Sequence, residues 1–292
     1  MKVLRADVMG MCFGVRDALK IIDAIETPEQ VTIHGELVHN EAVLERLDTR
    51  GFRQVDEKAR LALPMTDTVL ITAHGVSQKE RQRLAAAGKR LVDTTCPLVE
   101  RVHKAALALQ EEGYHVIVIG KRGHVEVQGV IGDLDRFHVV QSPEEVQSYP
   151  FERLGIVCQT TATARNVELI RAALAARNPH AEIRFIDTVC LPTKEHQHAL
   201  ERLIDQVEAM VVVGGHNSNN TRELVNRCRA QGLPAYHVQS AADLQSAWFE
   251  GIETVGLTAG TSTLDETIEE VYDELLHLGA GATQRGLTGL LQ

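Results

Sequence analysis

The stretch RLVDTTCPLVERVHKAALALQ (residues 90–110) contains the pattern on which the predicted fold rests. A short apolar strand runs into Cys96, and a proline follows at the first helical position, where its missing N–H costs nothing. Val99, Val102 and Ala106 then recur at intervals of three and four residues, which places them on one face of the helix. The stretch therefore predicts a strand, a thiol at the corner and an amphipathic helix.

The same design occurs twice more, in KVLRADVMGMCFGVRDALKII (residues 2–22) and in IRFIDTVCLPTKEHQHALERLIDQV (residues 183–207). Their cysteines, Cys12 and Cys190, occupy the same corner between strand and helix as Cys96. A helix N-terminus lowers the pKa of a thiol and favours the thiolate that binds metal. A single free cysteine is most often a buried packing residue. Three of them at matching corners favour a shared role instead.

Strand candidates alternate with helical patterns along the whole chain, as in parallel βαβ sheets. They lie near residues 2–6, 31–34, 52–55, 68–72, 90–93, 115–119, 137–140, 154–158, 182–186, 210–213, 235–238 and 254–257. We expect an α/β fold of three similar lobes with mainly parallel four-stranded sheets. The expected lobes are 13–95, 96–189 and 190–280, the last completed by 1–12 through pairing of the first strand, with a flexible tail at 281–292.

The composition restricts the kind of partner. The chain has 292 residues, 44% of them hydrophobic, and a formal net charge of −10. This charge argues against nucleic acid, whose phosphates are bound by clustered Lys and Arg, but not against a small phosphorylated ligand. The start of the sequence has no uninterrupted apolar stretch of signal-peptide length, and no segment approaches the apolar length of a membrane span. Five widely spaced cysteines without a secretion signal favour the cytoplasm over a disulfide framework.

Small polar residues follow the predicted strands, and ligands of open parallel sheets bind beyond the carboxyl ends of the strands. The segments are 34–40, 72–75, 120–126, 159–161, 214–221 and 258–262. Each one alone could be a turn or a helix cap. Two such segments in each repeat favour a shared polar centre for an anion. No dinucleotide or P-loop pattern is present, which disfavours an NAD or ATP enzyme.

Three distant cysteines favour an iron–sulfur cluster over zinc, because zinc sites usually show cysteine pairs two to four residues apart. Three thiolates would leave one iron open as a Lewis acid. Cys158 lies in an apolar strand and Cys228 on an apolar helix face, so both are interpreted as packing residues. Glu126 is the lone acid of its strand-end loop: it is either a solvated helix-start residue or, if burial raises its pKa, a general acid.

Together these segments resemble the 4-hydroxy-3-methylbut-2-enyl diphosphate reductases (the LytB family) of the non-mevalonate isoprenoid pathway. The resemblance covers about residues 1–279. Its motifs are GMCFGV (10–15), VHN (38–40), AHGVS (73–77), DTTCPLV (93–99), GHVEV (123–127), QTT (159–161), NSNN (217–220) and TAGTS (258–262).

The resemblance implies one [4Fe-4S] cluster per chain, held by Cys12, Cys96 and Cys190 at the centre of a pseudo-threefold arrangement of lobes. It implies that Glu126 is the proton donor and that Thr160 lies beside the substrate hydroxyl. The diphosphate would be bound by His39, His74, His124, Ser218, Asn219, Asn220 and Ser262. The implied reaction is a two-electron reductive dehydroxylation that gives isopentenyl and dimethylallyl diphosphates, with electrons from a ferredoxin or flavodoxin.

The chain departs from the family pattern at a few positions. The family often has Phe at the position of Met11, Pro at that of Val125, Ser at that of Asn219, and an Arg-Gln pair near His196-Gln197. None of these changes removes a cluster ligand or the acid. Three alternatives stay open at this point: a different cluster dehydratase resembling quinolinate synthase, a cluster-bearing redox sensor, and a metal-free phosphosugar-binding protein.

Overall fold

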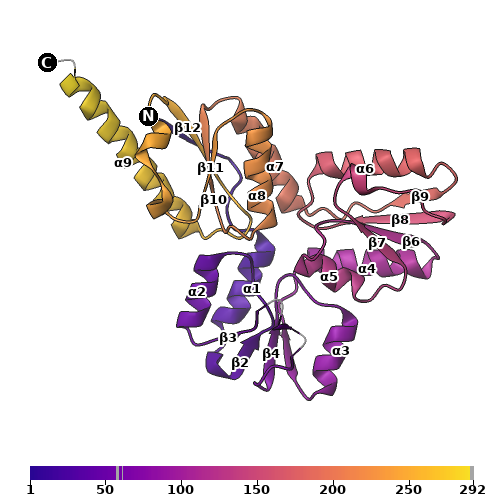
Figure 1. Cartoon of the computed structure of the whole chain (residues 1–292). Coiled ribbons are helices and arrows are strands. Elements are labelled where there is room, and N and C mark those ends of the chain that lie inside the picture. Colours follow the sequence, from indigo (N-terminus) through magenta and orange to yellow (C-terminus); the bar gives the residue numbers. More distant parts are fainter. Residues whose placement is uncertain (57–58, 61, 290–292) are drawn as a thin grey trace. The chain divides into compact units, whose positions relative to one another are not determined.

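The computed structural model describes residues 1–56, 59–60 and 62–289, with side chains as far as residue 280 (Figure 1). Three parallel four-stranded sheets alternate with helices, which confirms the predicted α/β class. The first sheet has the order β3 (Arg53–Gln54), β2 (Val31–Ile33), β4 (Thr68–Ile71), β5 (Arg90–Asp93). The second has β7 (Phe137–Val140), β6 (His115–Ile119), β8 (Arg153–Cys158), β9 (Glu182–Phe185). The third has β11 (Ala235–Val238), β10 (Ala209–Val213), β12 (Thr254–Ala259), β1 (Lys2–Arg5).

The three sheets therefore have one topology, and the strand that leads to a cysteine is at the edge of each. In the third sheet this edge strand is β1, from the opposite end of the sequence. It pairs in parallel with β12, with Val3 opposite Val255. The expected pairing of the first strand into the last lobe is confirmed.

Nine helices are described: α1 (Phe13–Asp23), α2 (Glu41–Thr49), α3 (Gln78–Ala86), α4 (Pro97–Glu111), α5 (Val125–Ile131), α6 (Ala164–Arg177), α7 (Leu191–Ile204), α8 (Asn219–Ala230) and α9 (Asp265–Gly289). Those that follow the cysteines, α1, α4 and α7, begin at the residue after Cys12, Cys96 and Cys190. The helix starts predicted from the sequence are thus confirmed. Within the described ranges, no helix is long and apolar enough to cross a membrane.

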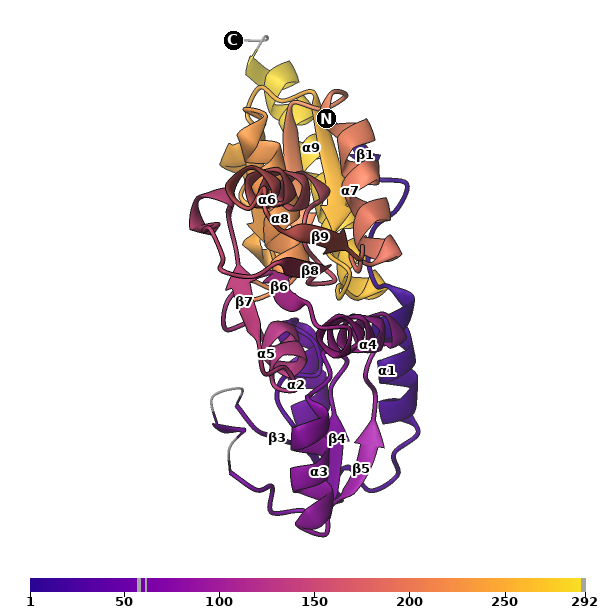
Figure 2. The ribbon, with the colours of Figure 1, turned by 90° about the vertical axis from the view of Figure 1, so that its right-hand side faces the viewer.

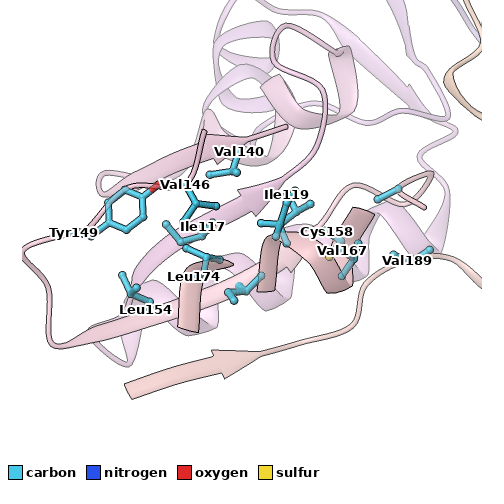
Figure 3. Packing of buried hydrophobic residues seen from close by; sticks show 13 residues of the cluster. Ile117, Ile119, Val140, Val146, Tyr149, Leu154, Cys158, Val167, Leu174 and Val189 are labelled. Atoms are coloured by element: carbon cyan, nitrogen blue, oxygen red, sulfur yellow. The ribbon is translucent and has the colours of Figure 1, made fainter. Parts of the chain in front are cut away.

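Buried side chains cover both faces of the second sheet. Ile117 and Ile119 point to the face covered by α6, where they pack with Leu174 and other apolar residues (Figure 3). Val116 and Val118 alternate with them and pack against α4 and α5. This period of two is the pattern of a strand buried on both faces. Each such side chain contributes about 1.5–3 kcal/mol on burial, so the strand ends are firmly held.

The third sheet is built in the same way. Val211 and Val213 face α9, where they meet Val271 and Leu275. Met210 faces the opposite side, which is covered by α7 and α8. Figure 2 shows these helices around the third sheet.

By density of contacts the chain forms two compact units. One consists of Met1–Cys12, His39–Val43 and Pro192–Gln292, and the other of Phe13–Val38 and Leu44–Leu191. The three-lobe boundaries at 95/96 and 189/190 remain a proposal based on the three sheets. Helix α9 extends to Gly289, within the range predicted as a flexible tail. The last part of that tail, 290–292, lies outside the described residues.

Candidate functional site

A repeated backbone hydrogen bond holds each of the three cysteine corners. The cysteine N–H donates to the carbonyl two residues beyond the end of the neighbouring strand, β4, β8 or β12. The pairs are Cys96 to Ala73 (3.1 Å), Cys190 to Thr160 (3.0 Å) and Cys12 to Thr261 (2.9 Å). One geometry therefore fixes all three corners, although the segments between edge strand and cysteine differ in length.

The three corner cysteines differ from the other two. Cys12, Cys96 and Cys190 are half-buried, whereas Cys158 and Cys228 are buried. Burial raises the pKa of the Cys228 thiol to about 12, which leaves it protonated and inert. Cys158 and Cys228 both lie in apolar clusters, in keeping with a packing role.

The thiol of Cys96 lies close to the backbone of Gly14. A Cβ placed on Gly14, in the first turn of α1, would lie only 2.6 Å from the Cys96 sulfur. Any side chain at position 14 would therefore displace this thiol. The sequence GMCFGV (10–15) thus contains a glycine for close approach, as well as a cysteine.

The corner cysteines belong to different units: Cys12 to one, Cys96 and Cys190 to the other. In the part of the chain that the structure describes, no group of three His, Cys, Asp or Glu side chains is arranged to hold a single metal ion. An iron–sulfur cluster contains several irons and is held by cysteine thiolates, so it is a different kind of site from that of a single metal ion. Half-buried thiols at helix starts are suitable donors for such a cluster.

Glu126 and Thr160 form a buried polar contact in the second lobe. The Thr160 N–H donates to Oε1 of Glu126 at 2.6 Å, and the Thr160 hydroxyl donates to Oε2 at 2.8 Å. Glu126 is only 2% exposed and Thr160 6%. The solvated helix-start interpretation of Glu126 is therefore wrong, because the first turn of α5 carries this carboxyl into the interior.

His124 is the residue before α5 and caps it. Its ring Nδ1 accepts the backbone N–H of Glu126 at 3.2 Å. In the neutral ring this bond leaves the proton on Nε2, which becomes a donor. The His74 ring lies edge-on to that of His124, with centroids 5.6 Å apart. Two imidazoles that are distant in the sequence thus share one location in this unit.

The start of α8 contains an unsatisfied amide. Ser218 caps the helix by accepting the Thr221 N–H at 3.3 Å, and Asn219 is half-buried. Asn220 is 2% exposed, and neither its Oδ1 nor its Nδ2 has a hydrogen-bond partner among the described residues. Burying an amide without partners costs about 1–3 kcal/mol. A polar ligand would supply the missing partners.

Asn40 links two of the predicted segments in this unit. Its Nδ2 donates to the Ser262 carbonyl at 2.9 Å, and its Oδ1 accepts the Val43 N–H at 3.2 Å. His39 and Ser262 are therefore brought to one location, beside the loop that contains Gly215, whose Cβ would lie 2.4 Å from the His39 carbonyl oxygen. Asn40 was not among the predicted site residues. Its position directly before α2, where Asn is a favoured cap, was the available signal.

Gln159 was also not among the predicted site residues. Its Oε1 accepts the Lys121 N–H at 2.9 Å, and its Nε2 donates to the Thr161 hydroxyl at 3.2 Å. These bonds join the loops after β6 and β8, which carry Glu126 and Thr160. The pattern QTT (159–161) contained this residue, but nothing local indicated a partner in the loop after a different strand.

The predicted site residues thus fall into two groups. One unit contains His74, Cys96, His124, Glu126, Thr160 and Cys190, and the other contains Cys12, His39, Ser218, Asn219, Asn220 and Ser262. Each group lies at the carboxyl ends of its strands, where open parallel sheets bind ligands.

Comparison with known proteins identifies relatives along nearly the entire chain. The LytB protein family matches residues 3–276. A protein of Geobacter sp. (strain M21) named 4-hydroxy-3-methylbut-2-enyl diphosphate reductase is 34% identical over 278 residues, 94% of this chain and 97% of that protein. A protein of the same name from Anaeromyxobacter sp. (strain K) is 36% identical over 278 residues, 93% of this chain and 97% of that protein.

Solved structures that are similar to this chain carry the same kind of name as these relatives. The E-1-hydroxy-2-methyl-but-2-enyl-4-diphosphate reductase from Plasmodium falciparum superposes with a TM-score of 0.85 at 25% identity, covering 93% of this chain and 87% of that one. A structure titled as (E)-4-hydroxy-3-methyl-but-2-enyl diphosphate reductase, the terminal enzyme of the non-mevalonate pathway, gives 0.67 at 32% identity, covering 95% and 100%. Because the family matches most of its length and its relatives are similar from end to end, this chain belongs to the LytB family of iron–sulfur oxidoreductases.

Proposed function

We infer that this chain is a 4-hydroxy-3-methylbut-2-enyl diphosphate reductase, an enzyme of the non-mevalonate isoprenoid pathway. One structural observation carries the inference beyond the family match. The Cys190 N–H donates to the Thr160 carbonyl, and Thr160 donates two hydrogen bonds to the Glu126 carboxyl. A buried acid is thereby connected through a single residue to a corner cysteine. A redox sensor has no need of such an acid.

The reaction replaces a carbon–oxygen bond by a carbon–hydrogen bond. The substrate takes up two electrons and two protons, loses its hydroxyl oxygen as water, and becomes isopentenyl or dimethylallyl diphosphate. We propose that Glu126 supplies the proton that lets the hydroxyl leave, with the Thr160 hydroxyl beside the substrate oxygen. General acids typically contribute about 10²–10⁴-fold to such a step.

Cys12, Cys96 and Cys190 are the proposed ligands of one [4Fe-4S] cluster per chain. Support comes from their common corner geometry and their partial exposure. Three thiolates leave one iron without a protein ligand, so the bound cluster would supply single electrons and a Lewis acid. The protein's part is to hold the sulfurs and to keep the acid nearby.

The proposed donors to the diphosphate are His39, His74, His124, Ser218, Asn219, Asn220 and Ser262. The donor set is neutral, made of imidazoles, hydroxyls and amides, which suits a chain with a formal net charge of −10. The unsatisfied amide of Asn220 supports this assignment most directly. The Nε2 proton that capping leaves on His124 is a second suitable donor.

A one-electron protein donor, a ferredoxin or flavodoxin, is the proposed redox partner, and nucleic acid is not a partner. Cysteines that are few and widely spaced fit a reducing compartment, so the proposed location is the cytoplasm.

The deciding experiment is anaerobic incubation of the purified chain with the hydroxymethylbutenyl diphosphate, dithionite and a viologen, followed by product analysis. We expect brown protein with about four irons per chain, absorption near roughly 400 nm, and both diphosphate products. Cys12→Ser should lose iron and turnover, whereas the matched control Cys158→Ala should keep both. Colourless, iron-free protein that still reduces the substrate would disprove the mechanism.

A further inference from the structure

The carbonyl of the last residue in β4 and in β8 is held by a threonine hydroxyl. Thr94 Oγ1 donates to the Ile71 carbonyl at 2.6 Å. Thr188 Oγ1 donates to the Cys158 carbonyl, also at 2.6 Å. Both threonines stand two residues before a corner cysteine. In these two lobes, the segment that carries the cysteine therefore also anchors the end of the neighbouring strand.

The third lobe lacks this hydroxyl. The residue two positions before Cys12 is Gly10, which has no side chain and adopts a φ of +81°. The equivalent carbonyl, that of Ala259 at the end of β12, is instead bonded at 3.1 Å to Nδ1 of His196. His196 comes from the second turn of α7 and is 3% exposed. A histidine from a helix thus replaces a threonine from the cysteine loop.

The residues that follow Ala259 carry much of this unit's site. The Gly260 N–H donates to the Val213 carbonyl, and the Thr261 carbonyl accepts the Cys12 N–H, both at 2.9 Å. The Ser262 carbonyl accepts from Asn40. A shift at the end of β12 would therefore reach a proposed cluster ligand and a proposed diphosphate ligand together.

We propose that His196 is a positioning residue for the loop Gly260–Ser262. Its Nδ1–H holds the Ala259 carbonyl as the threonine hydroxyls do in the other lobes, and so fixes the Cys12 corner and Ser262. Within this proposal, the consequence for cluster and diphosphate rests on the proposed function. The contact with the Ala259 carbonyl stands independently of it.

The electrostatics of His196 agree with this role. Burial lowers the pKa of His196 below the ordinary histidine value, more strongly than the bond to Ala259 raises it. The ring is thus neutral near pH 7, and a neutral ring that bonds a carbonyl through Nδ1 must carry its proton there. Nε2 is left as an acceptor. Histidine therefore supplies one donor without adding a buried charge.

The first test is hydrogen exchange of the full chain, purified anaerobically, with three variants. His196→Leu removes the donor, and His196→Asn keeps an amide near the position of Nδ1. His198→Leu is the control, because His198 lies on the same helix with its side chain 66% exposed. We expect the backbone amides of Cys12 and Gly260 to exchange about 5–10-fold faster in His196→Leu alone. Unchanged exchange in His196→Leu, or equal loss in the Asn variant, would overturn the proposal.

The second test measures affinity for the hydroxymethylbutenyl diphosphate and iron loss to a chelator. His196→Leu should weaken substrate binding about 5–10-fold and speed iron loss, with His196→Asn close to the parent chain. If His196 only filled the core, both variants would have lower thermal stability, and they would not differ from each other in substrate affinity or in the rate of iron loss. If the parent chain neither holds iron nor reduces the substrate, the proposed function fails, whereas the exchange experiment still decides the role of His196.

Discussion

Glu126 in the second lobe and Asn220 in the third are equally buried, but they differ in whether their polar atoms have hydrogen-bond partners. Both carboxyl oxygens of Glu126 accept hydrogen bonds from Thr160. Both amide atoms of Asn220 lack partners among the described residues. The protein itself supplies the hydrogen-bond partners of Glu126, whereas the missing partners of Asn220 would have to come from a bound ligand. The proposed acid and the proposed diphosphate ligand therefore lie at the ends of different strands.

The largest expected effect concerns the satisfied group. Glu126→Gln keeps the size of the side chain but removes the transferable proton. Turnover should fall about 10²–10⁴-fold, while affinity for the diphosphate stays near that of the parent chain. Steady-state kinetics and calorimetric titration measure the two quantities. Glu168→Gln, at an exposed position of the same lobe, is the control, and equal turnover in the two variants would remove Glu126 from its role.

Asn220→Leu should separate binding from stability. The diphosphate would lose hydrogen bonds to a charged group, which are worth about 1.5–3 kcal/mol each, so affinity should fall at least about tenfold. The ligand-free protein, however, loses an unsatisfied buried amide and should unfold at the same temperature or higher. Calorimetric titration measures the expected fall in affinity, and thermal unfolding measures the expected equal or higher melting temperature. A fall in both affinity and melting temperature would mean that the amide has structural partners.

Thr160→Val, in the second lobe, should lower stability, whereas Asn220→Leu should not. It removes the hydroxyl that donates to the buried Oε2 of Glu126, which costs about 1–3 kcal/mol of unfolding free energy. Urea denaturation measures this loss. Thr160→Ser restores the hydroxyl and should recover most of the stability. Equal stability of the Val and Ser variants would show that the hydroxyl contact with Glu126 contributes nothing.

The smallest expected effect lies outside the strand-end groups. His115, at the amino end of β6, stacks on Phe151 and has its Nε2 2.6 Å from Nδ1 of His138. Burial first, then the nearby His138 and Arg136, lower the pKa of His115 to about 4. A base with a lowered folded-state pKa contributes stability above the unfolded value near 6.5, and this is lost as the pH falls toward 4.

We therefore expect His115→Phe to flatten the decline in stability between pH 6.5 and 4 by about 1 kcal/mol, a value that allows for partial solvent screening. Urea denaturation across this range measures the slope. Substrate affinity at pH 7.5 should be unchanged, unlike that of Asn220→Leu. An unaltered slope would show that the His115 proton does not differ between the folded and unfolded chain.

Local patterns were sufficient for the elements of the fold and for much of the site. All twelve predicted strands are present, because short apolar runs of four or five residues bounded by turns are typical of doubly covered strands. Asn40, Gln159 and His196 were not among the predicted site residues. Each acts through a partner distant in sequence, Ser262, Lys121 or Ala259. Such pairs depend on which strands are neighbours, and no local pattern encodes that.

The sequence by itself determined the α/β class, the three cysteine corners and the polar strand ends, since these follow from periodicity and from residues adjacent in the chain. Only the tertiary structure decided that Glu126 is buried against Thr160, that Asn220 lacks partners among the described residues, and that His196 replaces a threonine anchor. Burial and hydrogen bonding are properties of neighbours in space. In this fold those neighbours come from segments that lie far apart along the chain, as Thr160 does from Glu126 and Ser262 from Asn40.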